Sequence, residues 1–237
     1  MQRIVVLNSK GGSGKTTVAT NLATRLAMLN RQPVLLDLDP QASSIGWLAR
    51  RAGREPAIHG IAGFRRVTAT TRSWHLRLPP QCEAVVVDTP AAIATQELPE
   101  VTRGADVILV PVTPSQIDIQ ATAKCIGDLL LVAKVRKTNT RVGIVANRVK
   151  ANTLVARSLM RFIDSLDIPL VATLRDSQNY VHAVELGLGI FEMPDYQARQ
   201  DTERWLDLLQ WLGRGSGYSG NTHIEPAAQS GLTSANG

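Results

Sequence analysis

The segment "NSKGGSGKTT" (residues 8–17) gathers the residue types that bind phosphate, and it directly follows the apolar run "RIVVL". Its three glycines allow the backbone to turn tightly and to bring N–H groups against phosphate oxygens, while a following helix adds the positive end of its dipole. Lys15 is placed to reach β- and γ-phosphates, and the Thr16 hydroxyl is placed to bind Mg²⁺. The residue types and their spacing therefore predict a site for a nucleotide and Mg²⁺.

The same segment departs from the usual phosphate-loop pattern G-x-x-x-x-G-K-[ST] at two positions. Ser9 stands where the pattern has its first glycine, and an additional lysine, Lys10, precedes the glycines. A plain glycine turn is the alternative, but chance assembly of K-G-G-x-G-K-T-[ST] has odds on the order of one in a million per chain. We therefore interpret the segment as a nucleotide-binding loop. Its predicted contact residues are Lys10, Gly11, Gly12, Ser13, Gly14, Lys15, Thr16 and Thr17.

Three carboxylates at the ends of predicted strands complete this site. Asp88 closes the strand in "EAVVVDTP", where we expect it to hold Mg²⁺ through water, as in hydrolytic proteins with such a loop. Asp37 and Asp39 in "LLDLDPQ" are expected to point the same way on an alternating strand, so that one of them positions an attacking water. Structural turns after Asp88 and at Asp39 are the alternatives.

Short apolar runs alternate with longer helical patterns along the chain. Several runs are continuously apolar, as in parallel strands covered on both faces, and the alternation predicts an α/β fold with an open, doubly wound, mostly parallel sheet flanked by helices. Ligands of such sheets bind beyond the carboxyl ends of the strands. Strands are predicted at 3–8, 33–38, 84–88, 106–111, 141–146 and 168–172. Helices are predicted at 15–29, 42–52, 117–134, 152–165 and 178–187.

The length of 237 residues favours one domain, which we place at residues 1–213. Within it, residues 53–80 are less regular and are interpreted as a possible edge strand, a short helix and a loop. Residues 201–212, "DTERWLDLLQWL", predict an amphipathic closing helix. Residues 214–237 are small, polar and rich in Gly and Ser, which predicts a disordered tail.

Basic residues exceed acidic ones, and the excess is concentrated in one stretch. The net charge is +6, and residues 134–163 contain eight Lys or Arg and no acidic residue. A solvated helix face usually mixes both signs, so this stretch favours a nucleic-acid partner over an ordinary basic surface. The low aromatic content of 4% argues against a protein that stacks single-stranded bases.

The cysteine content and the apolar segments indicate a cytosolic setting. Cys82 and Cys125 are far apart in sequence and match no metal or disulfide spacing. The first ten residues contain only a short apolar run, and no segment approaches 18 apolar residues, so neither a signal peptide nor a membrane span is expected.

The motifs "KGGSGKTT", "DLDPQ", "VVVDTP" and "PVTPS" in this order resemble the ParA/MinD (deviant Walker A) family, especially its short ParA-type partition ATPases. The resemblance covers roughly residues 1–212, and it implies three catalytic residues, Lys10, Lys15 and Asp39. Lys10 matches the signature lysine that crosses to the phosphates of the partner subunit, and Asp39 the residue needed for hydrolysis. The implied metal-site residues are Thr16, Asp39 and Asp88. Asn147 in "VANR" matches a position that tends to contact adenine.

The resemblance also implies a function, a weak ATP hydrolase that a small ParB-like adaptor protein stimulates. The ATP-bound homodimer is expected to bind double-stranded DNA without sequence preference, in the cytoplasm and on the nucleoid. Its cycle would segregate plasmid or chromosomal DNA or position a large cargo such as a carboxysome or a chemosensory cluster. The expected DNA contacts are Arg157, Arg161 and Arg175.

Relatives on the same fold supply the alternatives. A MinD-like membrane ATPase would end in a basic amphipathic helix, whereas the polar side of the closing helix contains Asp201, Glu203 and Asp207. A small-molecule synthetase would need a dedicated substrate pocket, which the sequence does not reveal. A nitrogenase-iron-protein-like reductase needs cluster cysteines that are not present at suitable positions, and a tyrosine-kinase relative needs a tyrosine cluster where the tail has Tyr218.

Overall fold

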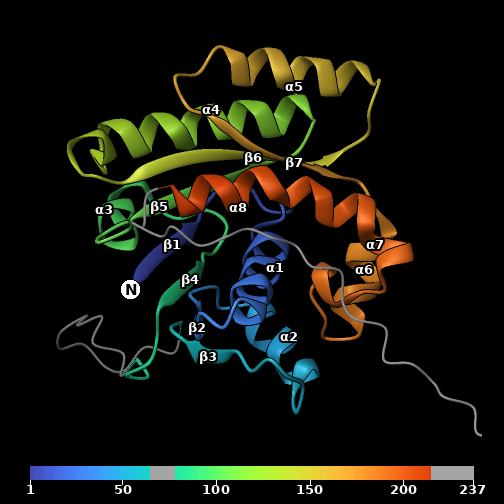
Figure 1. The fold of residues 1–237 in the computed structure, drawn as a ribbon. Coiled ribbons are helices and arrows are strands. Elements are labelled where there is room, and N and C mark those ends of the chain that lie inside the picture. Colours follow the sequence, from blue (N-terminus) through green and yellow to red (C-terminus); the bar gives the residue numbers. More distant parts are fainter. Residues whose placement is uncertain (65–77, 215–237) are drawn as a thin grey trace, which may run out of the picture.

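The computed structural model describes residues 1–64 and 78–214, and these form one seven-stranded sheet with helices on both faces (Figure 1). The strand order is β3-β2-β4-β1-β5-β6-β7, and every neighbouring pair is parallel. The predicted doubly wound α/β fold is thereby confirmed. The strands are β1 (Gln2–Val6), β2 (Pro33–Asp37), β3 (His59–Ala62), β4 (Ala84–Asp88), β5 (Val107–Val112), β6 (Arg141–Val149) and β7 (Leu170–Arg175).

The central strands are continuously apolar because both faces of the sheet are covered. On β1, Ile4 and Val6 pack into one core cluster with helix α1 (Lys15–Met28), whereas Val5 packs into another with helix α4 (Gln116–Leu131). Successive side chains of a strand point to opposite faces, so an uninterrupted apolar run fills both cores.

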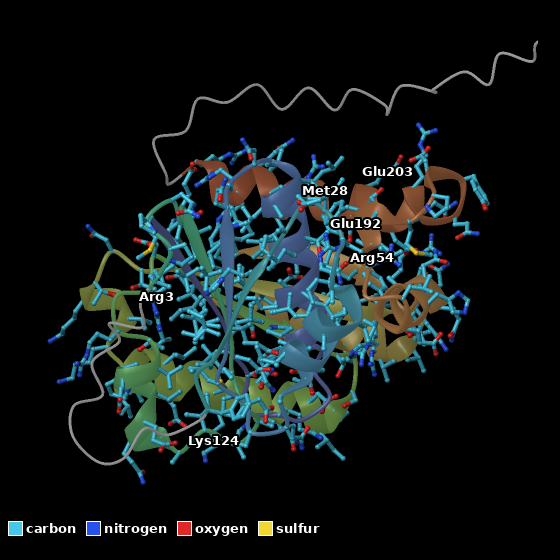
Figure 2. All side chains as sticks on the ribbon, turned by 90° about the horizontal axis from the view of Figure 1, so that it is seen from below. Arg3, Met28, Arg54, Lys124, Glu192 and Glu203 are labelled. Carbon is cyan, nitrogen blue, oxygen red and sulfur yellow. The ribbon has the colours of Figure 1, made fainter. Side chains whose placement is uncertain are left out.

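The helices divide between the two faces, as expected for a doubly wound sheet. In Figure 2, Lys124 on α4 lies on one flank of the sheet, and Glu192 and Glu203 lie on the other. The face of α4 also packs against α3 (Leu98–Val101) and α5 (Leu154–Asp164). The opposite face is covered by α1, α2 (Ser43–Arg51), α6 (Gln178–Glu185), α7 (Asp195–Thr202) and α8 (Leu206–Gly213). Short 3-10 turns are η1 (Thr95–Glu97), η2 (Val135–Lys137), η3 (Ile190–Glu192) and η4 (Glu203–Trp205).

The closing helix predicted at 201–212 is interrupted. Its first two residues belong to α7, a helix that begins at Asp195, before the predicted start. The segment is divided into α7, η4 and α8. Two of its buried residues, Asp201 and Trp205, are hydrogen-bonded to α6 or to Ser177, the residue before it. The Asp201 carboxylate accepts a hydrogen bond from Ser177 Oγ at 2.8 Å, and Trp205 Nε1 donates to the Tyr180 hydroxyl at 3.0 Å. The buried apolar side of α8, with Leu208, confirms that this helix packs into the core.

Two strands differ from their predicted bounds by more than the others do. The strand expected at 168–172 begins only after Pro169, whose ring restricts the preceding residue and removes a ladder donor, and it continues to Arg175. Strand β6 extends to Val149, beyond its predicted end at residue 146.

The irregular region and the tail lie partly outside the described residues. Strand β3 is the edge strand expected within residues 53–80, and residues 65–77 of that region are not described. The predicted tail at 214–237 lies outside the description apart from Arg214. Across the part that is described, no helix combines the length and apolar character that crossing a bilayer requires.

Candidate nucleotide site

The carboxyl ends of β1, β2 and β4 bring the predicted site residues to one edge of the sheet. In the strand register, Asp88 lies beside Val6 on one side and beside Asp37 on the other. The glycine-rich loop begins just after Val6, so it starts next to both carboxylates. Asp37 and Asp88 are 51 positions apart in sequence, and Thr16 and Asp88 are 72 apart, and the parallel pairing of the strands brings them together.

The turn of the loop depends on two glycines with positive φ. Gly12 has φ 78° and Gly14 has φ 92°, a backbone region that L side chains rarely adopt. At Gly14 there is also no space, because a methyl group on its Cα would overlap Nδ2 of Asn147. Gly14 is the residue that caps α1, so the conformation directs the N-terminal N–H groups of α1 toward the loop.

Buried amide side chains hold the loop in place. Asn8 is fully buried, and its Nδ2 donates to Pro111 O at 2.7 Å and to Thr122 Oγ1 at 3.0 Å. Its Oδ1 accepts from Lys10 N at 3.0 Å, and Asn147 Nδ2 donates to Ser13 O at 2.9 Å. The loop is therefore fixed to β5, α4 and β6. The predicted adenine contact of Asn147 stays a prediction, and the contact that the structure shows is with the loop.

Lys15 spans the mouth of the loop. Its side chain is buried, and its Nζ donates to Lys10 O at 3.2 Å. Burial lowers the pKa of the amine, and the nearby carboxylates of Asp88 and Asp39 oppose that shift. An amine at the start of a helix, beside a glycine-rich loop, is suited to receive phosphate oxygens.

Asp88 and two hydroxyl groups form a compact polar cluster. Thr16 Oγ1 donates to Asp88 Oδ2 at 2.8 Å, and Ser44 Oγ donates to the same oxygen at 2.5 Å. Burial raises the pKa of Asp88 to about 6, although both hydroxyls lower it. The second oxygen, Asp88 Oδ1, is buried and accepts no hydrogen bond from the described residues.

The cluster fits a divalent cation. An unsatisfied buried carboxylate oxygen beside a threonine hydroxyl is a donor set that Mg²⁺ prefers, and a cation would offset the cost of burying the charge. In residues 1–64 and 78–214, no group of three or more His, Cys, Asp or Glu side chains gathers as a complete metal site. Binding of Mg²⁺ here would therefore also need oxygens of the nucleotide and water.

The two acidic residues of "DLDPQ" differ in their surroundings. Asp37 is fully buried and accepts hydrogen bonds from three backbone N–H groups, those of Asp39 at 2.9 Å and of Ser44 and Ile45 at 3.1 Å each. It thereby caps the N-terminus of α2. Asp39 is half-buried and accepts from Gln41 N at 2.9 Å. Strand β2 ends at Asp37, so strand alternation does not determine the direction of the Asp39 side chain.

Helix α2 is also fixed at its C-terminal end, by contacts that the sequence did not predict. Arg51 is 3% exposed and forms two hydrogen bonds of 2.7 Å to the carboxylate of Glu192. Trp47 Nε1 donates to Leu188 O at 3.2 Å, and Arg50 Nε donates to Val184 O at 3.1 Å. The only sequence signal is that Trp47 and Arg51 are four residues apart and so share a helix face.

The basic stretch of residues 134–163 is not one surface. Strand β6 crosses the sheet between Arg141 and Val149, so the basic residues before and after it are separated by roughly 26 Å. Arg141, at the amino end, donates to Trp211 O at 2.6 Å and lies over the Trp211 ring. The carboxyl end retains Arg148, Lys150 and the basic residues of α5.

The three predicted DNA contacts have different environments. Arg157 and Arg161 are exposed one turn apart on α5, whose opposite side buries Leu159 and Ile163. Arg175 is half-buried at the end of β7, where its Nε lies 3.5 Å from the buried carboxylate of Asp201. The structure therefore places two of the three on a free surface and the third in an ion pair.

The loop, the strand-end carboxylates and the sheet order agree with one known family. The model of the CobQ/CobB/MinD/ParA nucleotide-binding domain matches residues 4–190. The chain belongs to this family. Maintenance of carboxysome distribution protein A of Gloeobacter kilaueensis is 30% identical over 215 residues, which cover 89% of this chain and 94% of that protein. The protein of the same name from Halothiobacillus neapolitanus is 29% identical over 198 residues, which cover 80% and 87%.

Solved structures of the ParA/MinD type share the fold. A plasmid partition protein from Borrelia burgdorferi, crystallised with AMPPNP, superposes with a TM-score of 0.68 at 15% identity, and the match covers 89% of this chain and 99% of that one. The predicted resemblance to the ParA/MinD family is thus confirmed. The family model describes a nucleotide-binding domain, so membership of this family supports nucleotide binding by this chain.

Proposed function

We propose that this protein is a ParA-type ATPase that forms a homodimer on binding ATP, binds DNA without sequence preference and positions a large cargo over the nucleoid. A small adaptor protein would stimulate hydrolysis and thereby release the dimer from DNA. The cargo would be a replicon or a cellular body such as a carboxysome, the body for which the two relatives described above are named.

The observation that carries this proposal is the pair of lysines in one loop with different surroundings. Lys15 is buried at the mouth of the loop, whereas the side chain of Lys10 is 39% exposed at its rim. A buried lysine serves the phosphates of its own subunit. An exposed lysine beside the same site is available to the phosphates of a second copy, where it would stabilise negative charge as an arginine finger does.

The roles of the remaining residues follow from their positions. ATP would supply the transferable phosphoryl group, and Mg²⁺ would neutralise charge on its oxygens. Thr16 and Asp88 would hold the metal, with Ser44 fixing the carboxylate. Asp39 would orient the attacking water, because its carboxylate lies near Lys15 and, unlike that of Asp37, is not occupied by the N-terminus of α2.

The DNA surface is proposed along the exposed side of α5 and at the loop between β6 and α5. Arg148 and Lys150 precede α5, and Arg157 and Arg161 are exposed on it. Arg148 lies at the end of β6, Lys150 in the loop that follows and Arg157 in the first turn of α5, close to the edge that holds the glycine-rich loop, whereas Arg161 lies in the last turn of α5. Contacts of this kind neutralise DNA phosphates and do not read bases.

Binding to double-stranded DNA in the presence of ATP, ADP or no nucleotide tests the proposal. We expect measurable binding only with ATP, and a steep loss of affinity as salt rises from 50 to 200 mM because counterions are released. Fluorescence anisotropy with a labelled duplex of random sequence gives both quantities. Equal affinities in the three nucleotide states would contradict the proposed switch.

The proposed action of Lys10 on the phosphates of the partner subunit can be tested separately. Lys10→Ala should retain ATP binding, because Lys15 and the backbone of the loop remain, and should lose hydrolysis that depends on the adaptor. Lys124→Ala, on the exposed side of α4, is the matched control. Full stimulated turnover in Lys10→Ala would show that this lysine does not act on the partner's phosphates.

A further inference from the structure

The side chain of Lys10 already has an anionic neighbour in its own chain. Its Nζ lies 3.7 Å from Oδ1 of Asp118 and 3.5 Å from the carbonyl oxygen of Gly11. The Asp118 side chain is 17% exposed, so this pair is partly shielded from water. The lysine expected to reach a second subunit is therefore held on α4 when the subunit is alone.

The carboxylate of Asp118 is fixed independently of Lys10. Asp118 lies in the first turn of α4, where its N–H donates to Ser115 Oγ at 3.1 Å and its Oδ2 accepts from the Thr113 hydroxyl. A negative charge in this turn is favoured by the helix dipole, so the carboxylate does not depend on a lysine for its place. Only Oδ1 is directed to Lys10.

The loop and α4 are also fixed relative to one another, which makes the pair a built contact. Asn8 donates to Thr122 Oγ1 at 3.0 Å, and Ser9 Oγ lies 3.5 Å from Ala121 O. These contacts hold the backbone on the N-terminal side of Lys10 against the middle of α4. The fold therefore places the backbone of Lys10 within reach of Asp118, and the lysine side chain makes the contact at 3.7 Å.

We propose that Asp118 is a positioning residue that retains Lys10 in its own subunit and competes with the phosphates of a second copy. The inference rests on the proposed function, because it assigns a regulator to the same lysine. One ammonium group cannot occupy both places, so dimer formation must break two such pairs. Asp118 thereby weakens dimerisation of the ATP-bound protein.

The size of the effect follows from the exposure of the pair. Each partly exposed ion pair changes an equilibrium by a small factor, and two of them are lost per dimer. Removing the charge of Asp118 should therefore lower the dimer dissociation constant by roughly threefold to thirtyfold.

Asp118→Asn tests the contact in the nucleotide-free protein. Asparagine can still accept from Thr113, so the fold of α4 is preserved while the charge is lost. Reductive methylation followed by mass spectrometry should label Lys10 at least about twofold faster than in the wild type, relative to Lys124 as internal reference. Equal labelling rates of Lys10 in the two proteins would overturn the inference.

Two further variants separate the role of the charge from that of the helix. Asp128→Asn removes an acid of the same helix that accepts a threonine hydroxyl, from Thr95 at 3.1 Å, and it should leave Lys10 labelling unchanged. Asp118→Glu retains the charge and should restore slow labelling. Fast labelling in Asp128→Asn, or in Asp118→Glu, would also overturn the inference.

Sedimentation equilibrium with saturating AMPPNP tests the consequence for dimerisation. Asp118→Asn should dimerise more tightly than the wild type by the stated factor, and Asp128→Asn should match the wild type. An unchanged or weaker dimer in Asp118→Asn would overturn the competition. If no variant dimerises, the proposed function fails, and the labelling experiment still decides whether Asp118 holds Lys10.

Discussion

The two halves of the sheet use polar residues in different ways, although both place them after the carboxyl ends of parallel strands. Beside β1, β2 and β4, the polar side chains of Asp37, Ser44 and Asp88 are buried and bind one another or the backbone. Beyond β6, the charged side chains of Arg157 and Arg161 are exposed on α5. A small anionic ligand needs a few groups at fixed positions, whereas an extended polyanion needs only a sufficient density of charge.

This difference predicts how each half responds to substitution. In the buried half, one change leaves a charged or polar partner unsatisfied and costs several kcal/mol. On the exposed half, each arginine should make a small and nearly additive contribution to the free energy of DNA binding. The following experiments test that contrast, beginning with the largest expected effect.

Arg51→Ala should have the largest effect on folding. It leaves the carboxylate of Glu192 partly buried without its cation, which typically costs about 3–5 kcal/mol. Urea unfolding of the nucleotide-free protein measures the loss. Arg54→Ala is the matched control, because Arg54 is an exposed residue shortly after the same helix, and its change should stay within about 0.5 kcal/mol. Similar losses in both variants would mean that burial of the pair is not the cause.

Gly14→Ala should come next, by comparison with Gly12→Ala. Both glycines have positive φ, so each substitution brings a backbone penalty of about 1–2 kcal/mol. Only at Gly14 does the new methyl group also meet Asn147, whereas Gly12 faces open space. We therefore expect a thermal midpoint clearly lower in Gly14→Ala than in Gly12→Ala. Equal midpoints would show that the loop moves away from Asn147 at little cost.

Asp88→Asn should make the stability of the folded protein less dependent on pH. Burial raises the pKa of Asp88 from 3.8 to about 6, so the folded protein holds this proton more tightly than the unfolded chain. The resulting stabilisation is fully present below about pH 4 and is lost as the pH rises through 6, a total change on the order of 3 kcal/mol.

Urea unfolding without nucleotide at pH 5 and pH 7.5 measures this loss in both proteins. The wild type should lose more stability over the interval than Asp88→Asn does. If the two proteins respond equally to pH, Asp88 is not a buried carboxylate with a raised pKa.

Arg157→Ala should have the smallest effect, and that effect should appear only in DNA binding. Loss of one phosphate contact lowers the slope of log affinity against log salt by about one. Arg141→Ala is the contrast, since its side chain binds the C-terminal end of α8 and should affect stability alone. A lowered slope in Arg141→Ala, with none in Arg157→Ala, would place the DNA surface at the amino end of β6.

The parts of the site that could be predicted from sequence are those that local chemistry and sheet geometry determine. The loop is a continuous segment, and Asp88 follows a strand whose end must lie beside it in a parallel sheet. The role of Asp37 could not be predicted, because it depends on where β2 ends. The contacts of Arg51 with Glu192 and of Lys10 with Asp118 join residues more than 100 positions apart. No pattern within either segment indicates its partner.

The basic stretch of residues 134–163 shows that residues adjacent in sequence can be far apart in the fold. Its eight charges are adjacent in sequence, and the prediction of one basic region was reasonable on that basis. A strand of nine residues within it moves the charges to opposite edges of the sheet. Counting charges along the chain therefore overestimated the density of charge at any one place.

Helix α2 is a rigid connection between two parts of the molecule, because side-chain contacts fix it at both ends. At one end, Ser44 is hydrogen-bonded to Asp37 and Asp88, and at the other end Arg51 is hydrogen-bonded to Glu192. Its nine residues span about 13 Å and cannot shorten without breaking helical hydrogen bonds. A displacement of Ser44 along the axis of α2 would therefore strain the Ser44–Asp88 bond at one end and the Arg51–Glu192 pair, which precedes α7, at the other.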